Sequence, residues 1–154
     1  MNAQENAKQE LSFTFIEQPH EIPHFLTRKD IVDFFHYKMQ PYHDEKKDIN
    51  NALDYAFDKN RGGFLLLATT NKKISGATLF LKTGMGGYIP ENLLLFVAVD
   101  PQSRGRGIGR KIIEKAMTRC DGDVKLHVEV DNPASRLYER LGFEKAYLEM
   151  RYKQ

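Results

Sequence analysis

The feature that most constrains the fold is an abrupt change of pattern around residue 100. Residues 91–99, ENLLLFVAV, are apolar at nearly every position, which is typical of a strand covered on both faces of a sheet. Arginine and glycine then alternate over residues 104–107, and helical spacing of apolar side chains follows at Ile112, Ile113 and Ala116. A buried strand that passes through a glycine-rich bend into an amphipathic helix predicts a sheet with helices packed on it.

Hydrophobic periodicity predicts further elements on both sides of this unit. We expect strands over residues 11–18, 64–70, 74–83, 91–99, 124–130 and 144–153. We expect helices over about 27–40, 44–59, 108–120 and 132–143. The resulting order, β-α-α-β-β-β-α-β-α-β, predicts a mixed α/β sheet with hairpins in the middle and parallel pairing near the C-terminus. Residues 1–10 are polar and lack periodicity, so we expect a flexible segment there and a single domain over residues 11–154.

Composition excludes several classes of protein. The net charge is only +2, from 23 basic and 21 acidic residues, which argues against a nucleic-acid-binding protein. Cys120 is the single cysteine, so the chain forms no internal disulfide, and its apolar helix face suggests a small buried side chain. No apolar run approaches the roughly 20 residues of a membrane span, and no signal-like segment opens the chain. We therefore expect a cytoplasmic protein without membrane contact, and no His/Cys/Asp cluster predicts a metal.

The bend at residues 104–109 has the composition of an anion site. The N–H groups at the start of a helix have no intrahelical partner, and the helix dipole adds partial positive charge there. Gly105, Gly107 and Gly109 let the backbone approach a bulky phosphate closely, and the neighbouring arginines supply charge. Two known phosphate loops fail on spacing, because Arg110 stands where both a Walker loop and the dinucleotide fingerprint need glycine. An RNA-binding arginine–glycine segment and a plain turn remain the alternatives.

Two sequence blocks together resemble the GNAT superfamily of N-acetyltransferases. The first is Arg104-x-x-Gly107-x-Gly109 after the apolar strand, and the second is DNPASRLYERLGF over residues 131–143. The resemblance is clear over residues 63–143. It implies a mixed, mostly antiparallel sheet with a parallel central pair and helices on both faces. It also implies transfer of the acetyl group of acetyl-CoA directly to a primary amine, on a small molecule or on a protein.

The resemblance implies a role for each matching residue. Tyr138 is expected near the sulfur of coenzyme A, where its hydroxyl assists the departing thiolate, or it is a packed helix tyrosine. Asn132 is expected to hydrogen-bond the coenzyme A arm, although capping the following helix explains it equally well. The bend is expected to bind the pyrophosphate, and the end of the preceding strand to bind the pantetheine arm and polarise the thioester carbonyl. The expected cofactor-binding residues are Val97, Ala98, Val99, Arg104, Gly105, Arg106, Gly107, Ile108, Gly109, Arg110, Lys111, Asn132 and Tyr138.

The general base is less determined. Glu91 begins the apolar strand, and relatives often carry a glutamate in this strand that acts as base directly or through water. His127 alternates with apolar residues, shares a strand face with Glu129 and has a suitable intrinsic pKa range. A structural role would also explain each residue: a charge at the strand end for Glu91, and a hydrogen-bonded polar strand face for His127 and Glu129. The acceptor site is open, and residues 42–45 and 84–91 are candidates to line it, with acidic side chains suited to a cationic amine.

Other functions are compatible with the same residues. A non-catalytic acyl-CoA sensor on this fold is the main alternative, since a fold does not by itself specify chemistry. We expect a monomer or a homodimer. The chain is short after Phe143, so the last two strands of the family are expected to be compressed or merged.

Overall fold

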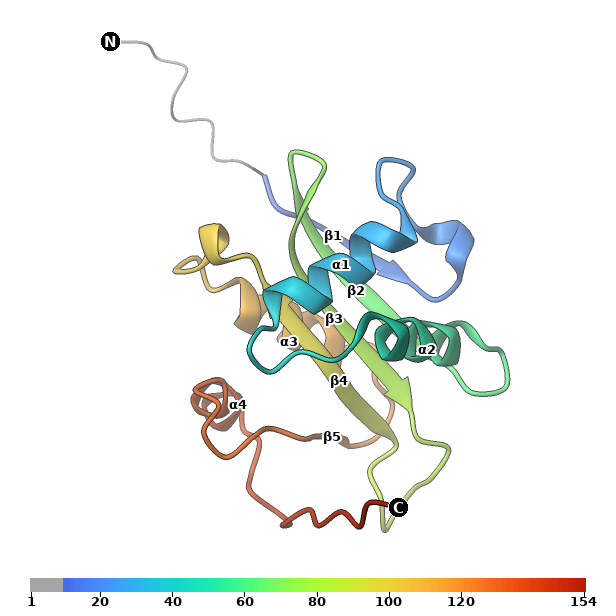
Figure 1. The fold of residues 1–154 in the computed structure, drawn as a ribbon, viewed down its shortest axis with the longest axis vertical. Helices are drawn as coiled ribbons and strands as arrows, with labels where there is room; N and C mark the ends of the chain where they lie inside the picture. The colour runs from blue at the N-terminus through green and yellow to red at the C-terminus, as the bar shows by residue number, and fades with distance from the viewer. Residues whose placement is uncertain (1–9) are drawn as a thin grey trace.

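A five-stranded sheet with order β1-β2-β3-β4-β5 forms the centre of the molecule in a computed structural model, which describes residues 10–154 (Figure 1). Neighbouring strands are antiparallel except β4 and β5, which are parallel. The strands are β1 Ser12–Ile16, β2 Gly63–Thr70, β3 Lys73–Lys82, β4 Asn92–Val99 and β5 Val124–Leu126. The helices are α1 Arg28–Lys38, α2 Lys46–Phe57, α3 Ile108–Met117 and α4 Ser135–Arg140, with 3₁₀ turns at Pro19–Glu21 and Pro101–Ser103.

Short-range signals in the sequence account for several element boundaries. The Thr27 side chain accepts a hydrogen bond from the Asp30 N–H, and the Asp30 carboxylate accepts one from the Thr27 N–H, so a capping box starts α1 as predicted. Asn71 and Lys72 have φ values of 51° and 62° in the two-residue connection of β2 to β3. Positive φ at both positions matches the twist of the flanking strands, which confirms the predicted hairpin.

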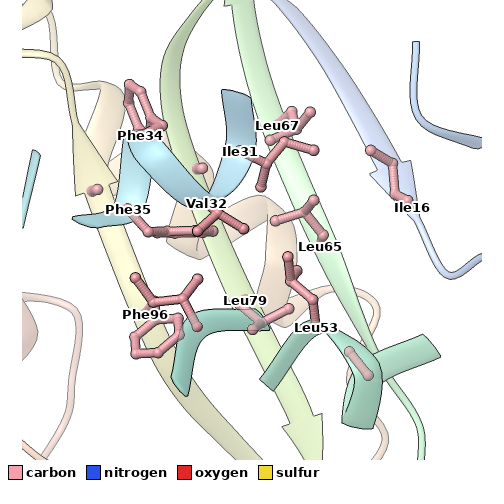
Figure 2. Close-up of a cluster of buried hydrophobic side chains, with 14 of the residues drawn as sticks. Ile16, Ile31, Val32, Phe34, Phe35, Leu53, Leu65, Leu67, Leu79 and Phe96 are labelled. Carbon is pink, nitrogen blue, oxygen red and sulfur yellow. The ribbon is translucent and has the colours of Figure 1, made fainter. Parts of the chain in front are cut away.

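Two hydrophobic layers hold the helices on opposite faces of the sheet. Helices α1 and α2 cover one face, and α3 lies behind the other (Figure 1). Figure 2 shows the first layer, where Phe35 and Leu53 point from the helices toward Leu65, Leu79 and Phe96 of the strands. Full burial of side chains of this size stabilises a fold by about 1.5–3 kcal/mol each. The predicted mixed sheet with helices on both faces is confirmed.

A β-bulge in β4 changes which side chains face which helix layer. Leu79 pairs with Phe96 and Phe80 pairs with Leu94, so Leu95 is an extra residue on β4. Leu94 belongs to the α3 layer, whereas Phe96 packs in the α1–α2 layer. Beyond the bulge the alternation therefore runs in the opposite phase, and Val97 and Val99 pack against the α3 layer.

The predicted C-terminal strands are the main corrections. The strand expected over 124–130 ends at Leu126, because the chain then turns, with the Asn132 N–H donating to the Glu129 carbonyl. The segment expected as a strand over 144–153 forms no strand, and its alternating side chains stay exposed, including Tyr147 at 94% and Met150 at 87%. The parallel pair consequently lies at the edge of the sheet, not at its centre.

Smaller corrections concern the element ends. β4 begins at Asn92, one residue after Glu91, and α4 begins at Ser135, so Pro133 precedes the helix. The flexible segment predicted for residues 1–10 lies outside the described residues except for Glu10. Within residues 10–154, every helix is too short or too polar to cross a lipid bilayer.

Candidate functional site

The glycine-rich bend at residues 104–109 leaves the start of α3 exposed to solvent. Gly107 precedes α3 as its N-cap with φ 69°, and Gly105 has φ 81°, both in the left-handed region that favours glycine. A Cβ atom at either position would meet no atom within 4 Å, so the space above the bend is open. The first helical hydrogen bond runs from the Lys111 N–H to the Gly107 carbonyl. The N–H groups of the first turn of α3 therefore have no intrahelical acceptor, and they lie beside open space.

Cationic side chains surround this helix start. Arg104, Arg106, Arg110 and Lys111 are all exposed. The Arg110 Nε donates to Glu114 Oε1 at 2.8 Å along the exposed side of α3. Ile108 is 2% exposed and anchors the helix start in the core, while its neighbours stay in solvent. The arrangement suits a phosphate-bearing anion.

β4 and β5 diverge next to the same helix start. Their ladder contains only the pairs Asn92↔Val124, Leu93↔Lys125 and Leu94↔Leu126, so no β5 residue pairs with β4 beyond the bulge. Val97 and Val99 line this open edge as half-buried side chains. At Gly109 a Cβ would lie 3.4 Å from Leu137 Cδ2 and 3.5 Å from Val99 Cγ2, so the starts of α3 and α4 meet the end of β4 here. The result is an unpaired, apolar end of β4 next to the exposed start of α3.

Tyr138 of α4 packs on the same side of the sheet as Val97, Val99 and α3. It is 8% exposed, packs in the α3 layer and meets the Phe143 ring edge-on with ring centroids 6.0 Å apart. Within residues 10–154 its hydroxyl has no hydrogen-bond partner. Burial, with a smaller contribution from the Glu129 carboxylate, raises the pKa of Tyr138 to about 12. The phenol therefore stays protonated at neutral pH and is available as a donor.

Asn132 connects the end of the β5 segment to α4. Its Oδ1 accepts from the Ala134 N–H at 3.0 Å, and its Nδ2 donates to Glu129 Oε2 at 2.9 Å. The N-cap of α4 is Ala134, without a side-chain cap, so the predicted helix cap by Asn132 is wrong. The Asn132 amide instead stabilises the turn before α4 and also bonds the Glu129 carboxylate. The sequence placed Glu129 only as a companion of His127; its spacing of three residues before Asn132 was the available signal.

Glu91 lies at the opposite end of β4 from the bend. Each residue of a strand advances by about 3.3 Å, so Glu91 is roughly 20 Å from Val97. Its carboxylate accepts from the Asp123 N–H at 2.7 Å, and hydrogen bonds from its own N–H and that of Asp123 lower its pKa. A base must reach the reacting amine directly or through one water. The position of Glu91 therefore favours a structural role at the β5 entry, and its role as base stays a prediction.

His127 and the loop between α1 and α2 lie on the β5 side of the site. The exposed His127 ring has its Nδ1 3.9 Å from Glu149 Oε2 of the C-terminal segment. The Tyr42 hydroxyl donates to the Asp131 carbonyl at 3.2 Å, which joins the α1–α2 loop to the turn after β5. Burial raises the pKa of Asp44 in this loop, and the charges of Asp48 and Glu129 raise it further.

Comparison with known proteins identifies the family. A family model described as "Acetyltransferase (GNAT) domain" matches residues 61–145, which is more than half of the chain. The chain belongs to the GNAT acetyltransferase family. The match spans β2 to the end of α4 and so contains the bend, the divergent strands and Tyr138.

Curated relatives match this chain over a short segment. A mycothiol acetyltransferase of Rhodococcus erythropolis is 43% identical over 61 residues, which cover 36% of this chain and 20% of that protein. The N-alpha-acetyltransferase RimI of Mycobacterium tuberculosis is 40% identical over 58 residues, covering 36% of this chain and 37% of RimI. The matches thus span well under two thirds of these relatives' length.

Solved structures share the fold over nearly the whole chain. The aminoglycoside N-acetyltransferase AAC(6')-Iy in complex with CoA has a TM-score of 0.68 at 12% identity, covering 94% of this chain and 95% of its own. An integron cassette protein from the mobile metagenome of V. cholerae has a TM-score of 0.65 at 18% identity, covering 94% and 91%. At these identities the likeness concerns the fold.

The structure brings together part of the predicted site. The bend, the end of β4 and the helix that carries Tyr138 meet at Gly109, Asn132 lies in the turn before that helix, and Glu91 lies at the far end of β4. His127 lies one residue beyond the last paired residue of β5 and faces the C-terminal segment. Within residues 10–154 no group of three or more His, Cys, Asp or Glu side chains is arranged to hold a metal ion. Cys120 is half-buried, and burial raises its pKa to about 11, which disfavours the thiolate.

Proposed function

We propose that residues 11–154 act as one domain that transfers the acetyl group of acetyl-CoA to a primary amine. The observation that carries this proposal is the divergence of β5 from β4 beside the open start of α3. The helix start offers N–H groups and arginines for the pyrophosphate. The free edge of β4 at Val97, Ala98 and Val99 offers backbone groups for the pantetheine arm, and one N–H there would polarise the thioester carbonyl.

Direct transfer requires a neutral amine, since a lysine-like ammonium has a pKa of about 10.4. The amine nitrogen attacks the thioester carbon, the C–N bond forms, the C–S bond breaks, and the sulfur leaves with the electron pair. The amine loses one proton on becoming the amide, and this proton passes to the thiolate or to solvent. The reaction thus consumes a neutral amine and releases the amide and coenzyme A.

The difference in pKa between Tyr138 and the thiol of coenzyme A decides how Tyr138 assists the departure of the thiolate. A thiol like that of coenzyme A has a pKa near 8.5. The pKa of Tyr138 is raised to about 12, so full transfer of its proton to the thiolate is uphill by about 5 kcal/mol. A hydrogen bond from the hydroxyl to the developing thiolate carries no such penalty. We therefore assign Tyr138 the role of a hydrogen-bond donor to the leaving group.

An acceptor screen with acetyl-CoA tests the proposal. The relatives suggest the panel: an aminoglycoside, a peptide with a free α-amino group, and simple alkyl amines. Acetylation of one of them, detected as a mass gain of one acetyl group with release of free thiol, is the expected result. Tight acetyl-CoA binding without transfer to any amine would instead support the acyl-CoA sensor.

A further inference from the structure

The C-terminal segment over residues 144–153 runs outside the β5 edge of the molecule without joining the sheet. It forms neither helix nor strand, and Figure 1 shows it in red beyond β5. Within residues 10–154, its backbone N–H and carbonyl groups form no hydrogen bond. A segment with free backbone groups can pair with a strand of another molecule, which proteins usually prevent by keeping such edges short or covered.

The apolar side chains of this segment are almost fully exposed. Leu148, Met150 and Tyr152 are 83%, 87% and 91% exposed. Side chains two residues apart share one face of a strand, so strand pairing would gather these three into one apolar strip. Soluble monomers rarely leave a contiguous apolar patch in water. Within residues 10–154 nothing covers this strip, so its burial requires another molecule.

The charged residues between the apolar ones hold the segment to its own molecule. Glu149 Oε2 lies 3.9 Å from His127 Nδ1, and Lys145 Nζ lies 3.3 Å from Glu139 Oε1 of α4. Both contacts come from odd-numbered positions of the segment. Because neighbouring side chains of a strand point to opposite faces, a strand held in this way would turn its even-numbered apolar positions outward.

We propose that two copies of this chain form a homodimer by pairing these segments antiparallel, with Met150 opposite the partner's Met150. A twofold axis at this residue places Leu148 opposite the partner's Tyr152 and Glu149 opposite the partner's Arg151. Within one copy, Arg151 Nε lies 2.9 Å from Glu149 Oε1. The four charges of the two copies would therefore form a square of alternating sign on one face, while the apolar strips meet on the other.

Charge selects both the register and the partner. An axis one residue earlier would place Glu149 opposite the partner's Glu149, and an axis one residue later would place Arg151 opposite the partner's Arg151. Like charges directly opposite each other destabilise a strand pair. A segment that complements itself fits a second copy better than a lipid surface, where Glu149 would meet anionic headgroups. The inference does not rest on acetyl transfer, because the pairing is the same whatever reaction the domain performs.

Reversing the two charges one at a time tests the partner and the register together. In analytical ultracentrifugation, the wild-type protein should dimerise as its concentration rises. Glu149→Arg leaves positive charge at both positions, and Arg151→Glu leaves negative charge at both, so each variant alone should dimerise at least tenfold more weakly. An equimolar mixture of the two variants should dimerise again, because every positive position then lies opposite a negative one.

The matched control is Lys153→Glu. It changes the charge as Arg151→Glu does, but position 153 lies opposite the partner's Tyr147, so dimerisation should be nearly unchanged. A wild-type protein that stays monomeric up to about 1 mM would overturn the inference. A dimer that persists in both single variants, or a mixture that stays monomeric, would overturn it as well, and binding of a monomeric wild type to anionic vesicles would assign the segment to a membrane surface instead.

Cross-linking provides a second measurement that does not depend on the charges. Directly opposite residues of an antiparallel pair have Cβ atoms about 4.5–5.5 Å apart, close enough for a disulfide after a small adjustment. In a Cys120→Ser background, Met150→Cys should therefore give a covalent dimer on mild oxidation. Tyr147→Cys in the same background should not, because the two copies of residue 147 would lie about 20 Å apart along the strands. Equal cross-linking at both positions would reject the register.

Melting of every variant shows whether it is folded. The substituted side chains are exposed and lie outside both hydrophobic layers, so each Tm should stay close to that of the wild type.

Discussion

Replacing Gly107 by valine separates the cost of backbone strain from the loss of acetyl-CoA binding. Gly107 has φ 69°, where an L-residue is disfavoured by about 1–2 kcal/mol and a β-branched one by more. For a chain of this length, each kcal/mol lowers Tm by about 2–4 °C. Strain at this N-cap should also turn the first N–H groups of α3 away from the pyrophosphate that we propose they bind. A hydrogen bond to a charged group contributes about 1.5–3 kcal/mol, so losing one weakens binding about 10- to 150-fold.

The matched control is Gly84→Val. Gly84 has φ 74°, a Cβ there would also meet no atom within 4 Å, and it lies in the loop between β3 and β4. Both variants should lose similar Tm in calorimetric melting, because they strain the backbone in the same way. Isothermal titration with acetyl-CoA should show weaker binding in Gly107→Val alone. Equal affinities of the two variants would refute the assignment of the pyrophosphate site to the bend.

The remaining predictions concern Tyr138, Glu91 and His127. Tyr138→Phe should leave acetyl-CoA affinity nearly unchanged and lower kcat by about 100-fold or less. General acid–base assistance gives about 10²–10⁴-fold, and Tyr138 only donates a hydrogen bond. Turnover equal to that of the wild type would show that Tyr138 has only a packing role. The folded-state pKa of Glu91 is lowered, so its stabilisation is present above its unfolded pKa and is lost as the pH falls through the folded value. The Tm of wild type should therefore exceed that of Glu91→Gln at pH 6, and the two should converge below about pH 4; a gap independent of pH would contradict this. If His127 is the base, His127→Gln should remove the acidic limb of the pH profile of kcat/KM, while Glu91→Gln retains it. An acidic limb that persists in both variants would reject both residues as the base.

Part of the fold could be predicted from interactions between residues that are adjacent in the sequence. The Thr27–Asp30 capping box, the Asn71-Lys72 turn and the glycines of the bend each have a conformational requirement that neighbouring residues fulfil. The two sequence blocks were sufficient for the family, because the bend and Tyr138 lie within the matched domain. Such features depend on a few adjacent residues, which sequence reasoning can examine directly.

The features that sequence reasoning missed depend on distant partners. Alternation over residues 144–153 shows that the segment is suited to a strand, but it contains no information on whether another strand is available to pair with it. The bulge at Leu95 was hidden because LLLFVAV is apolar throughout, so its pattern has no phase that an extra residue could shift. The bond from Asn132 to Glu129 depends on the turn that ends β5, which was expected to continue as a strand.

The extra residue at Leu95 gives β4 a position where the chain can lose a residue without turning the proposed site over. The ladder with β5 ends at Leu94, and the bulge begins at the next position. If Leu95 were deleted, Leu94 would still pair with Phe80 and Phe96 with Leu79, so β4 would regain regular alternation and Val97 and Val99 would still face α3. A residue lost after the bulge has no such compensation, because it shifts every later side chain of β4 to the other face or pulls the bend along the strand. We therefore expect natural length variation among relatives to be tolerated in the loop over residues 84–90 and at the bulge, and eliminated over residues 97–99.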